Sequence, residues 1–202
     1  MDIFTPNQPA NLLPYDGTVN YYGKIMPSEG MFRYLEVLLD NIDWKHDEAK
    51  IFGKHIVTKR MVAWYGDDDF SYTYSNTTRH SLPWTKELLE LKALCEESTG
   101  HTFNSCLLNL YHNGDEGMAW HSDDEKSLGK DTAIASMSFG AERKFKLKHR
   151  QSKYGVSINL ESGSLLIMKG ATQTHWLHCL PKSKRVKGLR INLTFRTYIM
   201  QG

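Results

Sequence analysis

The second half of the chain is divided into short runs that predict β-strands, and this division constrains the fold more than any other feature. Each run is apolar or alternates apolar with polar residues, and Gly, Asn, Asp and Ser separate the runs. The runs are Leu107–Tyr111, Thr132–Phe139, Arg143–Lys148, Val156–Leu160, Ser164–Met168 and Leu189–Ile199. Strands spaced in this way, without helices between them, predict an antiparallel sandwich or jelly roll.

Two amphipathic helices are predicted before these strands. Ser28 is the expected N-cap of the first helix, and Gly100 is the expected end of the second, which follows Pro83. Apolar residues at helical spacing define the buried faces: Met31, Tyr34, Leu35, Leu38 and Leu39 in the first helix, and Leu88, Leu91, Leu94 and Cys95 in the second. The predicted fold class is therefore mainly β with flanking helices (α+β).

The length of 202 residues is enough for one domain with a sizeable core, so we predict a single domain over residues 1–202. Within it we expect an N-terminal arm at 1–25, a lid of short strands and loops at 51–80, and a core at 105–199. No stretch reaches the ~18 consecutive apolar residues of a membrane span. The first residues also lack the basic and apolar regions of a signal peptide.

The cysteines and the charges narrow the class of protein further. Cys95, Cys106 and Cys179 are odd in number, lie far apart and form no CxxC pair, which favours a reducing compartment over a disulfide framework. The net charge of +2 does not by itself indicate a nucleic-acid binder. Basic residues nevertheless crowd two stretches, 143–153 and 182–187. A solvated basic loop explains either stretch when it is taken alone.

One candidate metal site lies in the strand-rich half. His121 and Asp123 are two residues apart, so on an extended chain their side chains point the same way. His175 follows a predicted strand and the Gly170 turn. Two histidines and one carboxylate form the triad that binds Fe(II) and leaves coordination positions open, although zinc can use the same ligands. Taken alone, the His-x-Asp pattern is weak, because each histidine can equally be a structural residue.

A candidate anion site lies on the last predicted strand. Arg190, Asn192, Thr194 and Arg196 alternate with Ile191, Leu193 and Phe195, so the polar set faces one side. Inward-facing arginines without partners are costly, and a small dicarboxylate satisfies both guanidinium groups. Asn109 and Tyr111 alternate with leucines in the same way and can donate hydrogen bonds into the same cavity. A solvent-facing polar side of an amphipathic strand is the alternative for each strand.

Charge counting links the metal and anion sites. Fe(II) with one aspartate is net positive, and the two arginines add to this charge. A dianion such as 2-oxoglutarate neutralises most of it, with the keto acid end on the metal and the distal carboxylate on Arg190. Oxidative decarboxylation of that co-substrate then supplies the oxidant for C–H attack.

Six segments in this order resemble the AlkB family of DNA-repair dioxygenases. They are Asn109–Tyr111, His121–Glu125, Ala135–Gly140, Gly163–Met168, Thr174–Trp176 and Arg190–Arg196. Each segment alone is weak, but six in the right order are specific, and the resemblance runs from about Ile51 to Tyr198. It implies a double-stranded β-helix (jelly-roll) core, N-terminal helices and a nucleotide-recognition lid. The sequence is most similar to the branch that acts on duplex DNA.

The resemblance also implies roles for individual residues. Iron is held by His121, Asp123 and His175, which are catalytic together with Arg196, and 2-oxoglutarate is held by Asn109, Tyr111, Arg190, Asn192, Thr194 and Arg196. Fe(II), with 2-oxoglutarate and O2 as co-substrates, then supports hydroxylation of the methyl group of N1-methyladenine or N3-methylcytosine. The base is repaired with release of formaldehyde, succinate and CO2.

The lid resembles known substrate-binding segments. Ile51–Lys54 is similar to a hydrophobic finger that lowers the cost of extruding a base from duplex DNA. Tyr74 matches the ring that stacks on the flipped base, and Arg60 matches a residue that fills the vacated gap. The implied substrate contacts are Phe52, Gly53, Lys54, Arg60, Tyr72, Thr73, Tyr74, Ser75, Asp124 and Glu125. Alternatively, Phe52 is an ordinary core residue, and Tyr72 and Tyr74 form one face of a strand.

The expected partner is alkylated DNA, single- or double-stranded, in contact with a monomer through phosphate-binding Lys148, Arg150, Lys184 and Arg185. Carboxylates at Asp124 and Glu125 suit an alkylated base, because the lesion makes the base cationic. RNA or single-stranded nucleic acid is an alternative substrate. A non-catalytic reader of alkylated bases and a zinc hydrolase using His175, His178 and Cys179 are weaker alternatives. We expect a cytoplasmic enzyme in a prokaryote or a nuclear one in a eukaryote.

Overall fold

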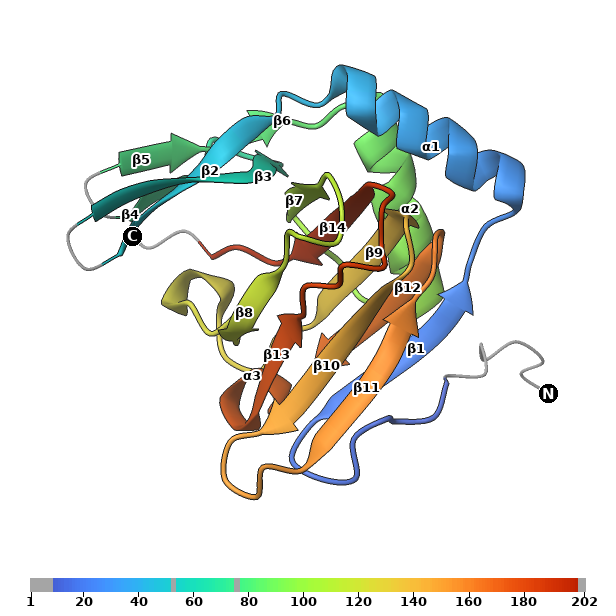
Figure 1. Cartoon of the computed structure of the whole chain (residues 1–202), viewed down its shortest axis with the longest axis vertical. Coiled ribbons are helices and arrows are strands. Elements are labelled where there is room, and N and C mark those ends of the chain that lie inside the picture. Colours follow the sequence, from blue (N-terminus) through green and yellow to red (C-terminus); the bar gives the residue numbers. More distant parts are fainter. Residues whose placement is uncertain (1–8, 52–53, 75–76, 200–202) are drawn as a thin grey trace.

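Two mainly antiparallel sheets face each other in the computed structural model, as Figure 1 shows. The structure describes residues 9–51, 54–74 and 77–199, with the backbone alone at 49–51, 54–56, 72–74 and 77–79. The larger sheet has the order β1 (Thr18–Lys24), β12 (Ser164–Lys169), β9 (Ile134–Gly140), β14 (Arg190–Arg196), β7 (Ser105–Tyr111), β3 (Lys54–Gly66) and β2 (Lys45–Ile51), and β6 (Leu82–Pro83) pairs with β3. The smaller sheet has the order β11 (Gly155–Leu160), β10 (Arg143–His149), β13 (Trp176–Leu180) and β8 (Met118–His121). The predicted jelly-roll class is confirmed.

Two strands of the smaller sheet, β8 and β13, were not among the predicted runs. β8 is short, and β13 directly follows the one-turn helix α3 (Thr172–His175). Neither segment shows the long apolar alternation that marks a strand in a sequence. They pair with each other, with His178 across from His121.

Helices α1 (Ser28–Asn41) and α2 (Lys86–Thr99) lie on the outer side of the larger sheet (Figure 1). The predicted N-cap of α1 is wrong by one residue: Pro27 is the N-cap, and no side-chain hydrogen bond caps this helix. The N-cap of α2 is Thr85, whose hydroxyl accepts a hydrogen bond from the Leu88 amide. Gly100 ends α2 as predicted, with a φ of 71° that favours glycine.

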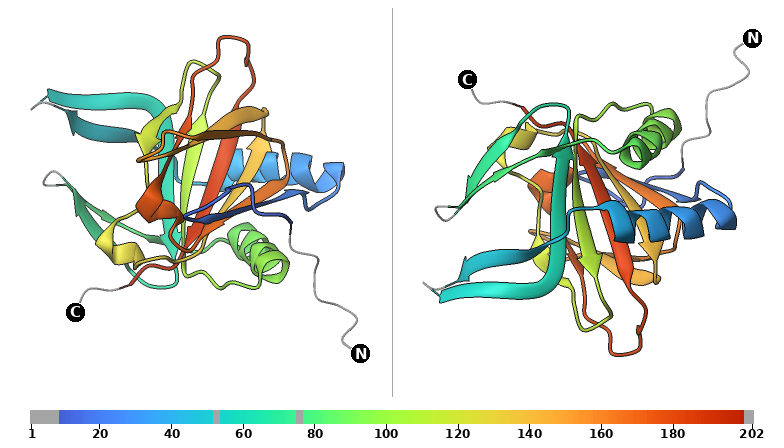
Figure 2. Two further views of the ribbon diagram at one scale, coloured as in Figure 1. Left: turned by 90° about the horizontal axis from the view of Figure 1, so that it is seen from below. Right: turned by 90° about the horizontal axis from the view of Figure 1, so that it is seen from above.

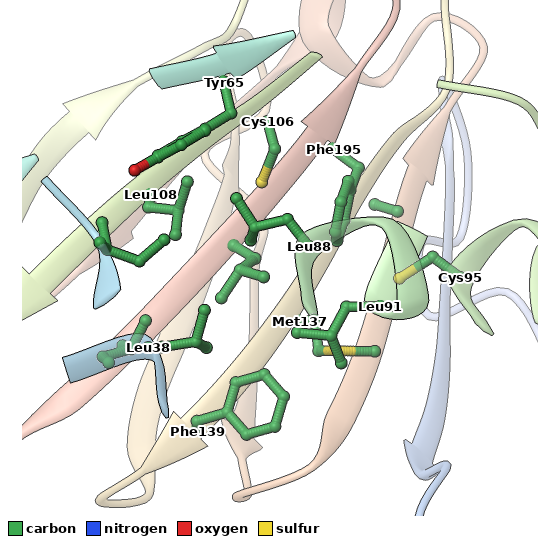
Figure 3. Packing of buried hydrophobic residues seen from close by; sticks show 14 of the residues in the cluster. Leu38, Tyr65, Leu88, Leu91, Cys95, Cys106, Leu108, Met137, Phe139 and Phe195 are labelled. Atoms are coloured by element: carbon green, nitrogen blue, oxygen red, sulfur yellow. The ribbon is translucent and has the colours of Figure 1, made fainter. Parts of the chain in front are cut away.

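The larger sheet is buried on both faces, which decides where the polar residues of its central strands point. One apolar cluster lies between this sheet and the helices (Figure 3) and includes Ile191, Leu193 and Phe195 of β14. A second cluster lies between the sheets and includes Tyr111, Phe145 and Trp176. Because side chains alternate along a strand, the polar residues of β14 and β7 face the space between the sheets.

The predicted lid region, 51–80, contains most of two hairpins. One is formed by β2 and β3, and the other by β4 (Ser71–Tyr74) and β5 (Thr77–His80). Both hairpins extend from the same side of the molecule, as Figure 2 shows. The inner half of β3 continues into the larger sheet, where Met61–Gly66 pairs with β7, so this hairpin is anchored to the strands that carry the site. None of the described helices is long and apolar enough to span a membrane.

Candidate active site

Two neighbouring strands bring a His–Asp–His group together. His121 ends β8, Asp123 follows two residues later, and His178 lies across from His121 on β13. The two imidazole rings are 4.2 Å apart between centroids, and His121 Nε2 is 3.8 Å from Asp123 Oδ1. One ligand atom from each of the three residues lies within 4.8 Å of the others. This donor set and spacing fit a metal ion with two histidine ligands and one carboxylate.

The prediction of His175 as the third ligand is wrong, because the structure places His178 beside His121 and Asp123. His175 ends α3, before the strand that pairs with β8 begins. Its ring is stacked 6.1 Å from that of His149, in a separate group that also includes Asp16. The cross-strand register identifies the correct residue, and this register cannot be inferred as long as β8 and β13 are not recognised as strands.

Hydrogen bonds orient two members of the triad. His121 Nδ1 lies 2.8 Å from the carbonyl oxygen of Ala119, and since a carbonyl only accepts, Nδ1 carries the proton and Nε2 keeps its lone pair. The backbone amide of Asp123 donates to Gln173 Oε1 at 2.9 Å. Gln173 is buried on α3 and was not predicted as a site residue. Both bonds hold ligand residues in place from outside the triad.

Electrostatics favour the protonation states of His178 and Asp123 that metal binding requires. Burial lowers the pKa of His178 to about 4, against an opposing effect of Asp123, so this imidazole is neutral near pH 7. Burial raises the pKa of Asp123, but Arg196 and the two imidazoles outweigh that effect and the net direction is down. A neutral imidazole and an ionised carboxylate are both ready to act as ligands.

The polar face of β14 forms a connected network between the sheets. Arg190 Nη2 donates to Ser138 Oγ at 2.9 Å and to Asn192 Oδ1 at 2.7 Å, and Asn192 Nδ2 donates to Thr194 Oγ1 at 2.8 Å. Ser136 also donates to Asn192. On β7, Tyr111 lies across from Arg190, and Asn109 lies across from Asn192. The predicted alternation therefore describes an inward-facing set, and the alternative of a solvent-facing polar side is excluded.

Arg190 is a buried cation in need of an anion. It is 2% exposed, its Nε has no hydrogen-bond partner, and no described carboxylate forms an ion pair with it. Burial lowers its pKa to about 10, Tyr111 opposes this, and Arg143 adds to it. An isolated buried guanidinium is costly, whereas a bidentate carboxylate pair offsets that cost. The residues present therefore fit a small dicarboxylate.

Arg196 connects this anion site to the triad. Its buried Nε also lacks a hydrogen-bond partner, and its Nη1 is 4.0 Å from Glu125 Oε1. Its positive charge lowers the pKa of Asp123. A ligand with one carboxylate near Arg190 and a second acidic group near Arg196 would span the distance from β14 to the triad.

Comparisons with known proteins agree with this donor set. The model of the 2OG-Fe(II) oxygenase superfamily matches residues 18–196. The chain belongs to this superfamily. Within it, human alpha-ketoglutarate-dependent dioxygenase alkB homolog 3 is 44% identical over 173 residues, which cover 81% of this chain and 60% of that protein. Mouse DNA oxidative demethylase ALKBH2 is 38% identical over 195 residues, which cover 93% and 81%.

These relatives confirm the predicted AlkB family. The chain spans about three fifths of the length of the alkB homolog 3 proteins that it matches. The structure of OsALKBH1 shares the fold, with a TM-score of 0.64 at 14% identity over 94% of this chain and 100% of that one. Fe(II), 2-oxoglutarate and O2 are accordingly the cofactor and co-substrates of this family, and the triad and the arginine pair provide chemically matching sites.

For most of the predicted substrate residues in the lid, the structure describes either the backbone alone or nothing. Phe52, Gly53 and Ser75 lie outside the described residues. Lys54 begins β3 and Tyr72, Thr73 and Tyr74 lie in β4, with the backbone alone described. Their side-chain roles remain predictions.

Arg60, by contrast, is fully described. Its Nη2 forms an ion pair with Asp47 across the β2–β3 hairpin, and its Nη1 lies 3.2 Å from the sulfur of Met118 on β8. Arg60 therefore ties the lid hairpin to the strand that leads to the triad, and its proposed role at a flipped base is additional to this contact.

Asp124 and Glu125 follow Asp123 of the triad directly and are exposed, with 65% and 42% of their side-chain area accessible. They border a cavity of about 400 Å³ that Asp123 and Gln173 also line. The two predicted carboxylates therefore lie next to Asp123 of the triad and line the same cavity.

The predicted phosphate-binding residues fall in two places. Arg150 donates to Ser122 Oγ at 2.6 Å and lies 3.6 Å from Asp124 Oδ2, and Lys148 Nζ lies 4.3 Å from the centre of the Trp120 ring. These two residues therefore contact the segment 120–124, which contains His121 and Asp123 of the triad. Lys184 and Arg185 are exposed on the loop after β13, which bonds through Ser183 and Val186 to Gly114.

Proposed function

We propose that this chain is an oxidative demethylase of alkylated nucleic-acid bases, with N1-methyladenine and N3-methylcytosine in DNA as substrates. The observation that carries the proposal is a His121–Asp123–His178 triad beside a buried arginine that lacks an anionic partner. The names of the relatives, alpha-ketoglutarate-dependent dioxygenase and DNA oxidative demethylase, support the same activity.

The chain would hold its cofactor and co-substrate with separate groups. His121, Asp123 and His178 would hold Fe(II), and Arg190 and Arg196 would hold 2-oxoglutarate, with Asn109, Tyr111, Asn192 and Thr194 around it. When bound, the iron, 2-oxoglutarate and O2 together supply the oxidising power that places a hydroxyl group on the alkyl carbon. Burial of Arg190 and Asn192 excludes water from the co-substrate site and strengthens each polar contact there.

The acidic residues after Asp123 support a cationic substrate. Methylation at N1 of adenine or N3 of cytosine places a positive charge on the base, and the exocyclic amine remains available as a donor. Asp124 and Glu125 are acceptor-only groups in their ionised form, so both the charge and the amine match them. Arg150 lies 3.6 Å from Asp124 Oδ2 and Arg196 lies 4.0 Å from Glu125 Oε1, so each carboxylate has one arginine nearby.

The lid hairpins support base extrusion. They extend from the same side of the molecule (Figure 2), and Arg60 joins the first hairpin to β8. An apolar wedge at Phe52 and a stacking ring at Tyr74 would lower the cost of holding a base outside the stack. Preference for duplex DNA depends on this wedge. Phe52→Ala should therefore reduce turnover on duplex DNA more than on single strands, and an equal loss on both would show that Phe52 is not a wedge.

A basic row on the smaller sheet supports contact with the nucleic-acid backbone. Lys144, Lys146 and Lys148 alternate with buried residues on β10, so they share the outer face of the sheet. Trp120 is 40% exposed on the same sheet and lies under Lys148. Cationic side chains beside an exposed aromatic ring suit a flexible single strand as well as a duplex. RNA or single-stranded DNA is therefore the second candidate substrate.

A turnover assay tests the proposal. The protein with Fe(II), 2-oxoglutarate and O2 should release formaldehyde from N1-methyladenine in matched single-stranded DNA, duplex DNA and RNA. Release from DNA at a rate above that from RNA supports the proposal, and the reverse order favours the RNA alternative. Tight binding of the methylated base without any formaldehyde would instead identify a non-catalytic reader.

A further inference from the structure

A second buried arginine lies between the two sheets. Arg143 begins β10 in the smaller sheet, and the residue is 2% exposed. Arg143 and Phe145 share the buried face of β10, and Phe145 belongs to the apolar cluster between the sheets. Arginine is almost never fully buried unless other groups satisfy it. The contacts of its guanidinium therefore indicate what Arg143 does.

The guanidinium of Arg143 binds two loops through their backbone. Its Nη2 donates to the carbonyls of Glu116 at 2.8 Å and Pro181 at 3.0 Å, and its Nη1 donates to the carbonyl of Asn113 at 3.3 Å. The loop with Asn113 and Glu116 joins β7 to β8, and the loop that begins at Pro181 joins β13 to β14. These four strands carry the two histidines of the triad and most of the candidate 2-oxoglutarate contacts.

The two loops are also joined to each other without Arg143. The Ser183 amide donates to the carbonyl of Gly114 at 2.7 Å, and the Gly114 amide donates to the carbonyl of Val186 at 2.9 Å. A Cβ atom at Gly114 would lie 1.9 Å from the carbonyl oxygen of Ser183, so this contact requires glycine. Because the loops have their own contacts, a conservative change at Arg143 should leave the fold intact.

The same guanidinium lies over the ring of Tyr111. The Cζ atom of Arg143 is 5.8 Å from the centre of this ring, and the Cζ atom of Arg190 is 5.6 Å from it. Arg143 comes from the smaller sheet, whereas Arg190 and Tyr111 are paired across two strands of the larger sheet. A guanidinium within about 6 Å of a ring centre is attracted to the ring, and more strongly when both are desolvated. Two arginines from different sheets therefore hold one tyrosine ring.

The hydroxyl of Tyr111 is available to a ligand. Tyr111 is 4% exposed, and within the described part of the chain no hydrogen bond joins its hydroxyl to another residue. A buried tyrosine usually finds a partner for its hydroxyl. The Nε of Arg190 also lacks a hydrogen-bond partner. One carboxylate beside both residues would supply the missing acceptor to each of them.

The charges of the two arginines favour an anion at the same place. Burial lowers the pKa of Arg190 to about 10, Tyr111 opposes this effect, and the like charge of Arg143 adds to it. The carboxylate of Glu116 accepts hydrogen bonds from the amide and ring of His112, and it forms no ion pair with Arg143 among the described contacts. A carboxylate bound at Arg190 would therefore be attracted by a second, unpaired guanidinium.

We propose that Arg143 is a positioning residue of the 2-oxoglutarate site, where it holds the Tyr111 ring beside Arg190 so that both residues receive the distal carboxylate. Arg143 acts through Tyr111 and does not itself contact the co-substrate. The inference rests on that part of the proposed function which places 2-oxoglutarate at Arg190. It does not depend on which nucleic acid is the substrate.

Calorimetric binding of 2-oxoglutarate to the full chain tests this proposal, with Mn(II) in place of Fe(II) so that no turnover occurs. Arg143→Lys keeps the positive charge but loses the planar fork over the ring, and the Kd for 2-oxoglutarate should rise about tenfold. In a Tyr111→Leu background the same change should raise the Kd less than about twofold, because the group through which Arg143 acts is already absent.

The matched control is Arg33→Lys. This change removes a guanidinium that lies 5.1 Å from the ring centre of Tyr34 on α1, away from the site. Its Kd for 2-oxoglutarate should equal that of the wild type. Wild-type protein that binds no 2-oxoglutarate would overturn the proposed function together with this inference. An unchanged Kd in Arg143→Lys, or an equal rise in both Tyr111 backgrounds, would overturn this inference alone.

A second ligand separates positioning from general damage to the fold. 2-Oxobutanoate has the same keto acid end as 2-oxoglutarate but no distal carboxylate, so it should bind Arg143→Lys and the wild type with equal affinity. Arg143→Gln, which retains amide donors for the loop carbonyls, is the second variant if Arg143→Lys unfolds, as judged by circular dichroism. Folded variants that lose affinity for both ligands by the same factor would show a purely structural role for Arg143.

Discussion

Two groups in this molecule have the same ligand types, two histidines and one aspartate, but only one of them has the surroundings of an oxidation catalyst. His121 and His178 lie on paired strands and Asp123 follows β8 directly, near Arg196 and the buried polar face of β14. Asp16, His149 and His175 lie between a loop, a strand end and a one-turn helix, with aromatic rings around them. The ligand types alone therefore do not identify the catalytic site, and the neighbouring anion site does.

The largest expected difference between the two groups follows from removing one carboxylate from each. Asp123→Ala should reduce formaldehyde release by more than about 100-fold, since loss of a ligand exceeds the effect of losing an outer contact. Asp16→Asn should reduce formaldehyde release by less than about tenfold, because Asp16 is outside the triad. Initial rates with saturating iron and 2-oxoglutarate measure both. Equal losses would mean that the two groups act together in catalysis.

The second-largest difference concerns the anion site, Arg190 and Arg196. This site lies near the triad and not near the Asp16–His149–His175 group. Arg190→Ala should raise the half-saturating concentration of 2-oxoglutarate by about 10- to 100-fold, since a charged hydrogen bond contributes about 1.5–3 kcal/mol. Lys187→Ala, at an exposed position on the loop before β14, is the control. An unchanged 2-oxoglutarate requirement in Arg190→Ala would remove Arg190 from the co-substrate site.

A smaller effect is expected from the hydrogen bond that positions Asp123. Gln173→Leu removes the acceptor of the Asp123 amide and should weaken Fe(II) binding by about 10- to 100-fold. The KM for the oligonucleotide should stay near the wild-type value, because Gln173 acts on the metal ligand. Thr174→Ala, at the exposed neighbouring position, is the control. If Gln173→Leu changes only thermal stability, Gln173 has a purely structural role.

The smallest effect is expected on the surface. The double variant Lys148→Ala and Arg150→Gln should lower the slope of log affinity against log salt by about one for each phosphate that is no longer neutralised. Lesion preference should stay the same, because phosphate contacts carry no base information. Binding to methylated and unmethylated oligonucleotides over a salt series measures this. A slope equal to that of the wild type would place the nucleic acid on another face.

The sequence predicted those parts of the molecule that depend on local periodicity. The alternation of Arg190–Arg196 correctly predicted that the polar side chains of β14 face inward. The short runs after Ser105 correctly predicted a jelly roll. Gly100 was correctly placed as the end of α2 because a left-handed residue is needed there. The N-cap of α1 was wrong by one residue, since Pro27 and Ser28 are both compatible with a helix start.

The third member of the triad was not predictable in the same way. His175 and His178 are three residues apart, and the choice between them depends on where β13 begins and how it pairs with β8. Such register is a property of the sheet, not of the local sequence. The roles of Gln173 and of the serines that contact the β14 network were missed for the same reason, because each contact joins separate elements.

The choice between the two neighbouring histidines gives the most direct test of the central claim. Formaldehyde release and bound Fe(II) should be measured for His178→Ala and His175→Ala under the same conditions. The structure predicts that His178→Ala loses iron binding and falls by more than about 100-fold in turnover, whereas His175→Ala keeps its catalytic iron and loses less than about tenfold. The opposite pattern, with His175 essential and His178 dispensable, would contradict this account of the active site.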